Sequence, residues 1–385
     1  MRAQMQPTQN GRLAFLAEWY HTEAAITRSF LLTFHLSDNA VELFDQRSKK
    51  TFLRRTKMPE LTRRDFFVGS KINVFGRQFD IVDYADDMTR NTLAKYRKRG
   101  FVLLKTNMWP KYLGDFLSTL IYNKININNG TMVQFTPKTV TEFLSNKEDD
   151  VQASVLMNEL LAGPAISFEL IGDNVSEIMI ACTNYGTEKA STTIGLSPSM
   201  QKLFEREEVR YGIYCPHSEE NVAKDLKFFF EEKHNIIKNC LFTNSTLAIV
   251  KPHSIKDGLL GQILVEILSA GFKITAMRML LMSRVNCEEF YEIYRGIVPE
   301  FIPMVAQLAS GICMCLEVSC EDTEKNAHQE FREFCGPMDP EIAKLLRPHT
   351  LRSKFGSSKV LNAVHCTDLE DDTRLELQYI FKILD

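Results

Sequence analysis

The chain has 385 residues, of which 44% are hydrophobic and 25% are charged, and its formal net charge is −3. This length exceeds one ordinary hydrophobic core and indicates two or three domains. The near-neutral charge argues against a general nucleic-acid or membrane binder, because such proteins usually carry a large basic excess. No apolar run approaches the roughly 20 residues that a membrane helix needs, and no apolar signal segment follows Met1.

Residues 10 to about 93 are predicted to be rich in β-strands. Residues 28–36 and 40–45 have the composition of strands with a polar turn between them, and 51–53 and 79–84 are expected to be further strands. The segment Phe75-Gly76-Arg77-Gln78 is the expected turn between two neighbours.

Three phrases in this region, at residues 15–20, 51–56 and 74–78, resemble the DM-ten domain of ciliary proteins. The resemblance implies a small β-barrel of the PH-like kind, which we assign to residues 10–97.

A basic run, Lys95-Tyr96-Arg97-Lys98-Arg99, follows this region. Two interpretations are open. The run is either a solvated boundary between domains or a contact for an acidic surface such as that of tubulin.

The rest of the chain contains an internal repeat. Residues 101–107 correspond to 247–253, Leu113-Gly114 to Leu260-Gly261, and Tyr214-Cys215 to His365-Cys366. One supersecondary plan therefore occurs twice, which indicates duplication of a complete domain.

The second copy has the clearer pattern of elements. It predicts a helix over 260–268 that stops at Gly271, a strand over 272–279, a helix over 288–294 and a strand over 312–318. A β-α-β-α-β order with helices packed on a sheet is typical of a ferredoxin-like core.

The C-terminal third holds the residues that suggest chemistry. Asn362-Ala363-Val364-His365 places a histidine after a turn of small residues, and Lys251 directly follows an apolar strand. The phrases Phe331–Pro337, Asp339–Ala343 and Asn362–Leu369 resemble the nucleoside diphosphate kinase family. The implied fold is α/β (α+β), with two tandem ferredoxin-like kinase domains at residues 101–236 and 244–385.

The resemblance implies that His365 is the nucleophile that accepts a phosphoryl group. An imidazole attacks through one nitrogen, so the other must be held by a hydrogen-bond acceptor. Glu376, which matches the family's orienting glutamate, would supply that acceptor. A lone histidine is more often structural, so the assignment depends on the surrounding motif.

The same resemblance implies a set of nucleotide-binding residues. Lys251 would hold phosphate and ribose, and Asn362 would bind the sugar hydroxyl. Arg332 and Arg352 would clamp the moving phosphoryl group, since guanidinium forks match its oxygens, although a single arginine is more often a salt-bridge former. Mg²⁺ would arrive with the nucleotide and be held mainly by it. The set is completed by Tyr291, which would help to hold the histidine, and Phe301, which would stack on the base.

Several positions depart from the family pattern. Met338 replaces a threonine near the phosphates, Lys359 a small apolar residue near the base, and Cys366 a glycine. Phe301 can stack on the base only if residues 295–299 absorb a one-residue offset. Loss of one hydrogen bond to a charged group lowers a rate about ten- to a hundredfold, so we expect reduced activity.

The first copy departs further. Lys105 survives, but Tyr214, Tyr211 and Gln201 occupy the positions of the histidine, the asparagine and the second arginine. His217 follows Tyr214 at a distance too great for a confident replacement. We expect this copy to be inactive and kept for architecture.

Two functions of different classes follow. The first is a kinase that exchanges γ-phosphates between nucleotides. The second is a structural protein of ciliary doublet microtubules with little or no kinase activity, bound to tubulin and other axonemal proteins.

The expected location is the cytoplasm and cytoskeleton, in the axoneme of a cilium or flagellum. The nine cysteines lack paired spacing, and Cys313-Met314-Cys315 fits a buried strand, so a reducing intracellular compartment is expected. Neither a nucleic acid nor a membrane is an expected partner. Assembly stays open between an oligomer of chains and a pseudo-dimer of the two copies within one chain.

Overall fold

The computed structural model describes residues 11–21, 26–93, 98–145, 150–187, 195–232 and 240–384. The chain divides into two compact units, Met1–Arg97 and Lys98–Asp385. The three predicted domain ranges stay predictions. Across the described ranges, no helix is both long and apolar enough to cross a membrane.

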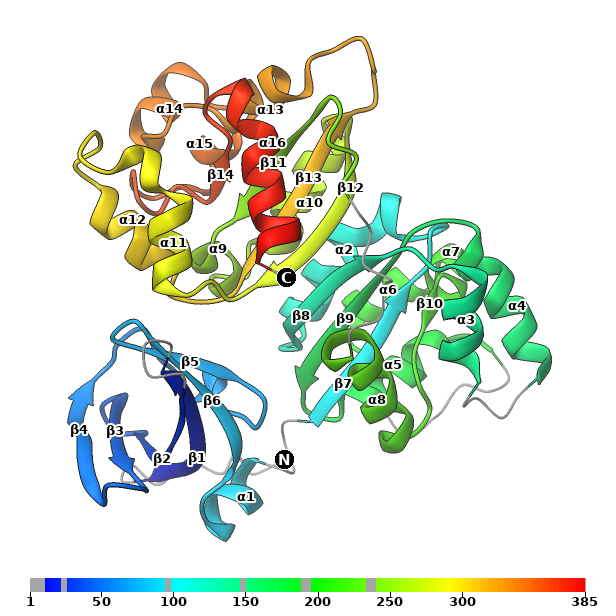
Figure 1. The fold of residues 1–385 in the computed structure, drawn as a ribbon. Coiled ribbons are helices and arrows are strands. Elements are labelled where there is room, and N and C mark those ends of the chain that lie inside the picture. The colour runs from blue at the N-terminus through cyan, green and yellow to red at the C-terminus, as the bar shows by residue number, and fades with distance from the viewer. Residues whose placement is uncertain are drawn as a thin grey trace. The chain divides into compact units, whose positions relative to one another are not determined.

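The first unit is a curled antiparallel sheet with the strand order β4-β3-β2-β1-β6-β5 (Figure 1). Large aromatic side chains such as Phe15, Phe30 and Phe34 are fully buried in its core. β4 and β5 are the two edge strands of the sheet, and residues of both line one small cavity. The two edges therefore come close together, and the sheet has a barrel-like form. The elements are β1 (Arg12–His21), β2 (Ile26–His35), β3 (Ala40–Asp45), β4 (Lys50–Lys57), β5 (Lys71–Val74), β6 (Arg77–Tyr84) and α1 (Asp87–Leu93).

The strand predictions in this unit are largely confirmed, with two differences. The strand expected at 51–53 spans eight residues, because it pairs along the whole of β3. The predicted turn is too long, since only Phe75 and Gly76 form it, both with positive φ, and Arg77 and Gln78 belong to β6.

The second unit contains one eight-stranded sheet with the order β10-β7-β9-β8-β12-β13-β11-β14. Each half has the antiparallel ferredoxin-like order, and the second half mirrors the first about the junction of β8 with β12. The strands are β7 (Lys98–Leu104), β8 (Asn126–Val133), β9 (Ala165–Gly172), β10 (Ile213–Tyr214), β11 (Ser245–Val250), β12 (Phe272–Leu280), β13 (Cys313–Cys320) and β14 (Val364–Cys366).

The helices of this unit also repeat. In the first copy they are α2 (Trp109–Tyr122), α3 (Pro137–Leu144), α4 (Asp150–Leu161), α5 (Val175–Thr183), α6 (Pro198–Phe204), α7 (Glu207–Tyr211) and α8 (Glu219–Leu226). In the second they are α9 (Pro252–Lys256), α10 (Leu260–Ser269), α11 (Arg284–Phe290), α12 (Phe301–Leu308), α13 (Ala327–Cys335), α14 (Pro340–Leu346), α15 (Leu351–Phe355) and α16 (Thr373–Gln378).

The structure confirms the helix at 260–268, and Gly271, with φ +85°, follows its end. The helix predicted at 288–294 begins earlier than expected, at Arg284. The side chain of Ser283 accepts a hydrogen bond from the Asn286 amide, so α11 begins at Arg284. It ends at Phe290, and a short 3-10 turn follows.

The two copies also meet through helices α2 and α10. A Cβ atom on Gly114 would lie 2.7 Å from the Gly261 carbonyl oxygen, and one on Gly261 would lie 2.6 Å from that of Gly114. Glycine therefore lets the two backbones touch. Buried residues of both copies form one hydrophobic core, so the copies are packed as a pseudo-dimer within the chain.

Candidate active site

The turn that precedes the strand of His365 is held in place by hydrogen bonds. β14 pairs with β11, opposite Ile249, and the Lys251 amide donates to the Ala363 carbonyl at 3.0 Å. Ala363 has φ +69°, a conformation that is unfavourable for a residue with a side chain. The hydrogen bond from the Ala363 amide to His253 Nε2, at 3.3 Å, helps to hold it there.

The state of His253 suits this acceptor role. Burial, together with the nearby charge of Lys251, lowers the pKa of His253 to about 4. The ring is therefore neutral near pH 7, and its other nitrogen, Nδ1, lies 2.8 Å from the Gln307 amide. The phrase Lys251-Pro252-His253 thus supports the turn before His365.

His365 is oriented by a carboxylate from α16. Its Nε2 lies 3.0 Å from Glu376 Oε2, which also accepts a hydrogen bond from Thr367 Oγ1 at 2.8 Å. The ring packs edge-on against Phe290 and Tyr291, with centroid distances of 5.1 and 5.8 Å. Because Nε2 is engaged, Nδ1 is the nitrogen available to attack a substrate.

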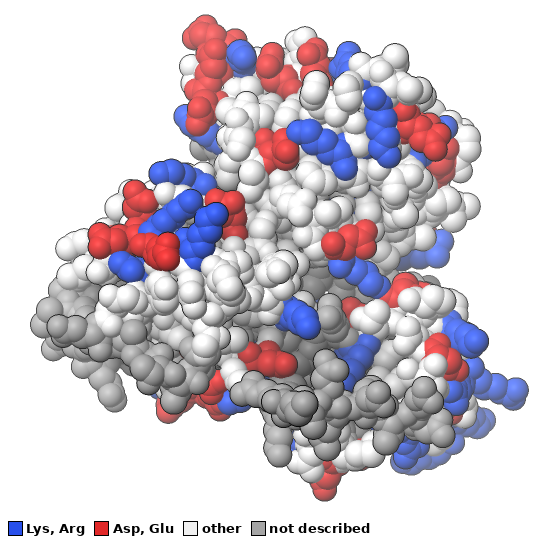
Figure 2. Space-filling view, turned by 180° about the vertical axis from the view of Figure 1, so that it is seen from behind, with Lys and Arg blue, Asp and Glu red and all other residues white. Residues whose placement is uncertain are grey.

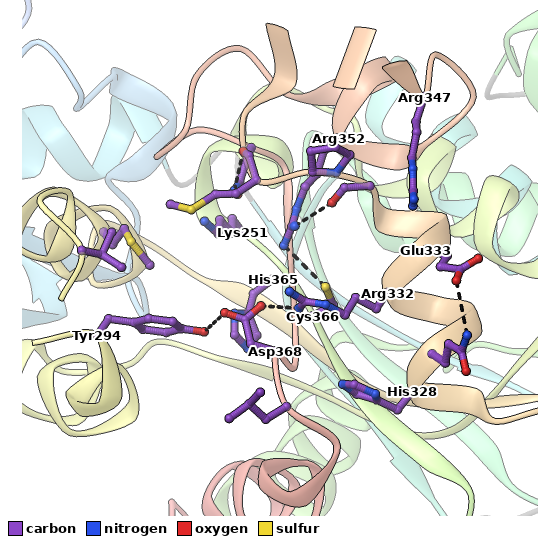
Figure 3. Close-up of a pocket in the computed structure, with 18 of the residues that line it drawn as sticks. Lys251, Tyr294, His328, Arg332, Glu333, Arg347, Arg352, His365, Cys366 and Asp368 are labelled. Atoms are coloured by element: carbon purple, nitrogen blue, oxygen red, sulfur yellow. Dashed lines mark hydrogen bonds and ion pairs between the residues drawn. The ribbon is translucent and has the colours of Figure 1, made fainter. Parts of the chain in front are cut away.

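A cavity of about 930 Å³ opens beside His365. Its wall brings together residues that are far apart in the sequence, and Figure 3 shows their side chains converging from several elements. Five of the predicted site residues line it: Lys251, Arg332, Arg352, Asn362 and His365.

Lys251 carries a buried ammonium group. It is 3% exposed, and its Nζ donates to the Val360 carbonyl at 3.2 Å. Burial, reinforced by the charge of Arg352, lowers its pKa to about 7. No carboxylate lies within ion-pair distance of it in the ranges that the structure covers. A phosphate entering the cavity would supply the missing negative charge.

Arg352 is held rigidly by main-chain acceptors. Its guanidinium donates to the carbonyls of Val364 and Gly336, at 3.2 and 2.9 Å, and to Cys366 Sγ at 3.5 Å. Gly336 has φ +80°, and a side chain there would collide with Thr350. The positive φ of Gly336 is thus part of the backbone conformation whose carbonyl accepts the hydrogen bond from Arg352.

Arg332 is more exposed and pairs with a carboxylate in the cavity wall. It donates to Asp368, which also accepts a hydrogen bond from the Tyr294 hydroxyl at 2.6 Å. Burial favours the neutral acid, but these two hydrogen bonds outweigh it and lower the pKa of Asp368. Asp368 is thus charged and holds the Arg332 guanidinium at the cavity.

Asn362 presents an acceptor to the cavity. Its Nδ2 donates to the Met338 carbonyl at 3.2 Å, whereas its buried Oδ1 has no partner among the residues that the structure describes. A buried oxygen without a partner is unfavourable. A ligand hydroxyl would satisfy it.

Comparison with known proteins agrees with this geometry. A family profile described as nucleoside diphosphate kinase matches residues 244–384, and one for the DM10 domain matches residues 3–89. "Nucleoside diphosphate kinase homolog 7" of Mus musculus is 37% identical over 382 residues, covering 98% of this chain and 94% of that protein. The chain belongs to the nucleoside diphosphate kinase homolog 7 family.

Shorter relatives, of the length of one kinase domain, match about a third of the chain. The nucleoside diphosphate kinase of Aquifex aeolicus is 34% identical over 140 residues, which are 36% of this chain and 95% of that protein. A crystal structure of the Aquifex aeolicus kinase covers 36% of this chain and 96% of its own, with 34% identity and a TM-score of 0.33.

The remaining predicted residues lie outside the cavity wall. Glu376 and Tyr291 stand behind His365, and the buried Tyr291 hydroxyl has no partner among the described residues. Phe301 does not line the cavity either. Its ring lies under the Arg295 guanidinium, 5.4 Å from the ring centroid, while Val298 and Met304 form the wall nearby. The stacking role of Phe301 stays a prediction.

Sequence reasoning missed several residues of the wall, among them His328, Arg347, Asp368 and Tyr294. His328 and Arg332 are four residues apart on α13, so they share one helix face, and this spacing could have identified His328. Arg347 reaches toward the cavity from the end of α14 (Figure 3). Arg347 directly follows α14, and its reach toward the cavity depends on where that short helix ends, so the sequence did not single it out.

The first copy repeats the fold of the second, but its side chains at the corresponding positions bond to one another. Tyr214 pairs with Leu103 in the register that His365 keeps with Ile249, and its hydroxyl donates to Asp225, eleven residues on, at 2.8 Å. Burial raises the pKa of Tyr214, so the phenol stays neutral. Tyr214 and Asp225 thus occupy the positions that correspond to His365 and Glu376.

The first-copy residues that correspond to Lys251 and Arg352 are also engaged in internal contacts. Lys105 Nζ lies 2.6 Å from Glu159 and 2.7 Å from the Tyr211 carbonyl. Gln201 donates to the Leu196 carbonyl, and His217 is exposed on the surface. The surviving lysine is therefore neutralised by an internal carboxylate.

No group of three or more histidine, cysteine or acidic side chains suited to a metal ion occurs in the described part of the chain.

Proposed function

We propose that the chain is a nucleoside diphosphate kinase whose single active site lies in the second copy. The observation that carries this proposal is His365, fixed through Nε2 by Glu376, in the wall of a cavity with Lys251, Arg332 and Arg352. An imidazole nitrogen facing several cations is suited to accept a phosphoryl group.

The reaction runs in two halves. Nδ1 of His365 attacks the γ-phosphorus of a nucleoside triphosphate, the bond to the β-γ bridging oxygen breaks, and a nucleoside diphosphate leaves. A terminal oxygen of a second nucleoside diphosphate then attacks phospho-His365 and takes the phosphoryl group. Glu376 accepts a hydrogen bond from the Nε2–H group and stabilises the positive charge that develops on the ring.

The cavity residues would hold the nucleotide in this reaction. Lys251 and the two arginines line the cavity and would face the phosphate oxygens, and Asn362 Oδ1 would accept a hydrogen bond from a sugar hydroxyl. Mg²⁺ would enter with the nucleotide and would offset part of the charge of its phosphates. Met338 lines the wall without offering a hydroxyl, and for this reason we propose a slow enzyme.

The test is a labelling experiment with γ-labelled ATP. The full chain acquires an acid-labile, base-stable label, which a chase with unlabelled GDP transfers to GTP. His365→Ala carries no label and performs no exchange. Demonstrable nucleotide binding without any label in the unaltered chain would rule out the enzyme.

A second function, as a structural component of axonemes in a cilium or flagellum, is favoured by the surface of the first unit. β4 is an edge strand whose side chains are mostly exposed, including Lys50, Arg54, Arg55 and Lys57. Figure 2 shows basic side chains gathered along one edge of this unit, at lower right. We propose that this strand contacts an acidic partner such as tubulin.

The basic run at the domain boundary is less suited to such a contact. Lys98 pairs with Glu219, and Arg99 pairs with Glu169, so both serve the second unit itself. Lys95, Tyr96 and Arg97 lie outside the described residues.

Co-sedimentation with axonemal doublets tests this second function. Lys50→Glu combined with Lys57→Glu reduces binding about tenfold or more if β4 is the contact. Lys202→Glu, at an exposed position of α6, is the matched control and binds normally. Equal binding by all three proteins would contradict the assignment to β4.

A further inference from the structure

Ala363, which lies between Asn362 and His365, has both of its main-chain polar groups bound at the start of helix α9. Its carbonyl accepts hydrogen bonds from the Lys251 amide at 3.0 Å and from Ser254 Oγ at 3.3 Å. Its amide donates to His253 Nε2 at 3.3 Å. The peptide groups on the two sides of Ala363 are therefore fixed by residues 251–254.

The position needs this support because its backbone conformation is unfavourable. Ala363 has φ +69°, in the left-handed region that a residue with a side chain rarely occupies. Asn362 precedes it, His365 follows two positions later, and both line the cavity. A return of φ to the ordinary range would turn these two side chains relative to each other. The strained conformation is thus what lets them share one wall.

The first copy shows that the fold itself does not require this strain. Gly212 corresponds to Ala363, and its carbonyl accepts a hydrogen bond from the Lys105 amide at 2.8 Å, as in the second copy. However, Gly212 has φ −78°, and its amide donates to the Glu208 carbonyl in an ordinary helical turn. The left-handed residue and the histidine that binds its amide occur together, in the copy that keeps His365.

The hydrogen bond from Ala363 also fixes the tautomer of His253. A neutral imidazole carries one hydrogen, so Nε2 can accept only if that hydrogen is on Nδ1. The Gln307 amide nitrogen lies 2.8 Å from Nδ1, which would set two N–H groups against each other. The reverse orientation of the Gln307 amide removes this conflict, because its oxygen then accepts from Nδ1–H.

Gln307 extends the hydrogen-bonded chain to the wall of the cavity. It lies on α12, three residues after Met304, which lines the cavity on the same helix face. The hydrogen bonds thus run from Gln307 through His253 to the amide of Ala363. A helix of the cavity wall and the turn before His365 are linked by one imidazole ring.

We propose that His253 is a positioning residue for phosphoryl transfer, which holds Ala363 in its strained conformation and so aims His365 into the cavity. Gln307 keeps the ring in the tautomer that this role requires. His253 itself contacts neither the nucleotide nor the reacting atoms. The effect on transfer rests on the function proposed above, whereas the tautomer and its hydrogen bonds do not.

The tautomer can be measured without any kinase activity. The full chain is prepared with ¹⁵N-labelled histidine, and long-range ¹H–¹⁵N correlation spectra are recorded near pH 7. The His253 signals are assigned by their absence in His253→Gln. We expect the hydrogen on Nδ1 and a bare Nε2, and we expect Gln307→Leu to allow both tautomers. A hydrogen on Nε2 of the unaltered chain would overturn the proposal.

The role in transfer is tested by the rate at which His365 is labelled at saturating ATP. His253→Phe keeps a ring but offers no acceptor, and should slow labelling about tenfold. His253→Gln keeps an acceptor near Nε2 and should stay within about threefold of the unaltered rate. His217→Phe makes the same change at an exposed position of the first copy and should have no effect.

A rescue experiment separates positioning from a general loss of structure. Glycine adopts positive φ without a steric cost, so Ala363→Gly removes the need to hold this conformation. In Ala363→Gly, the added change His253→Phe should slow labelling by no more than about threefold. An equal slowing with alanine and with glycine at residue 363 would show that His253 does not act through this turn.

Further outcomes distinguish this proposal from the proposed function. Should His253→Phe not fold, by urea unfolding, Gln307→Leu takes its place, and an unchanged labelling rate in it overturns the proposal. An unchanged rate in a folded His253→Phe does the same. The predicted tautomer in a chain that never becomes labelled would instead contradict the kinase function and, with it, the role of His253 in transfer.

Discussion

At the scale of single residues, the site is notable for polar groups that the folded chain leaves incompletely satisfied. The Lys251 ammonium is buried without a carboxylate, and Asn362 Oδ1 is buried without a donor, within the described residues. Both arrangements destabilise a folded protein. Phosphate and a sugar hydroxyl would relieve them together, so the cost is best explained by a nucleotide.

The lowered pKa of Lys251 predicts that nucleotide binding depends on pH. The ammonium form binds phosphate, so affinity for ADP should fall about tenfold between pH 6.5 and 8.5, as the lysine loses its proton near pH 7. Isothermal titration calorimetry measures this change. Lys251→Arg keeps its charge and should lose most of the dependence, while an equal slope in both proteins would contradict the assignment.

The same pKa has a consequence for stability. Because folding lowers the pKa of Lys251 from its usual 10.5, the folded state favours the neutral amine. The contribution of this group to the free energy of unfolding is thus unfavourable below about pH 7. It recovers as pH rises from 7 toward 10.5.

Met338 predicts a gain of activity. Its side chain lines the cavity where the resembling kinases have a hydroxyl. Met338→Thr would restore one hydrogen bond to the phosphates and raise the rate of His365 phosphorylation about tenfold. Met304→Thr, which alters another wall residue, serves as the control. An unchanged rate in Met338→Thr would show that the missing hydroxyl does not limit transfer.

Short sequence motifs were enough to predict most of the residues that line the cavity. His365, Lys251, Arg332, Arg352 and Asn362 all reach the cavity wall. Phe301 could not be placed, because its position depends on the backbone path of 295–299 and on the Arg295 guanidinium above it. Asp368 was missed because its importance lies in two hydrogen bonds from distant elements.

At the scale of secondary structure, apolar patterns predicted strands better than short helices. The central strands contain long runs of buried residues, and their positions follow from sequence alone. Helices α14 and α15 have only seven and five residues, too few for a repeating apolar face. The start of α11 was missed because it depends on the capping serine rather than on apolar spacing.

The crossing of α2 and α10 makes a prediction at this scale. Gly261→Ala would place a methyl group against the Gly114 carbonyl and Ser118, and we expect it to destabilise the chain by about 1–3 kcal/mol. Gly195→Ala, where the added carbon meets no atom, should change little. Urea unfolding measures both. Equal midpoints for the two variants would show that the helix contact is not tight.

At the scale of the second unit, the duplication is asymmetric in chemistry but symmetric in architecture. The repeat was visible in the sequence, but the joining of the two half-sheets was not, since it depends on the pairing of Thr131 with Arg278. The first copy supplies half of the sheet and of the common core. It could therefore lose its histidine without losing its structural role.

The central claim is that one chain carries one phosphate-accepting residue. The most direct measurement is the stoichiometry and position of the acid-labile phosphate after incubation of the full chain with excess ATP. We predict at most one phosphate per chain, located on His365, with no change in Lys105→Met. Phosphate on a residue of the first copy, or label that persists in His365→Ala, would contradict the account.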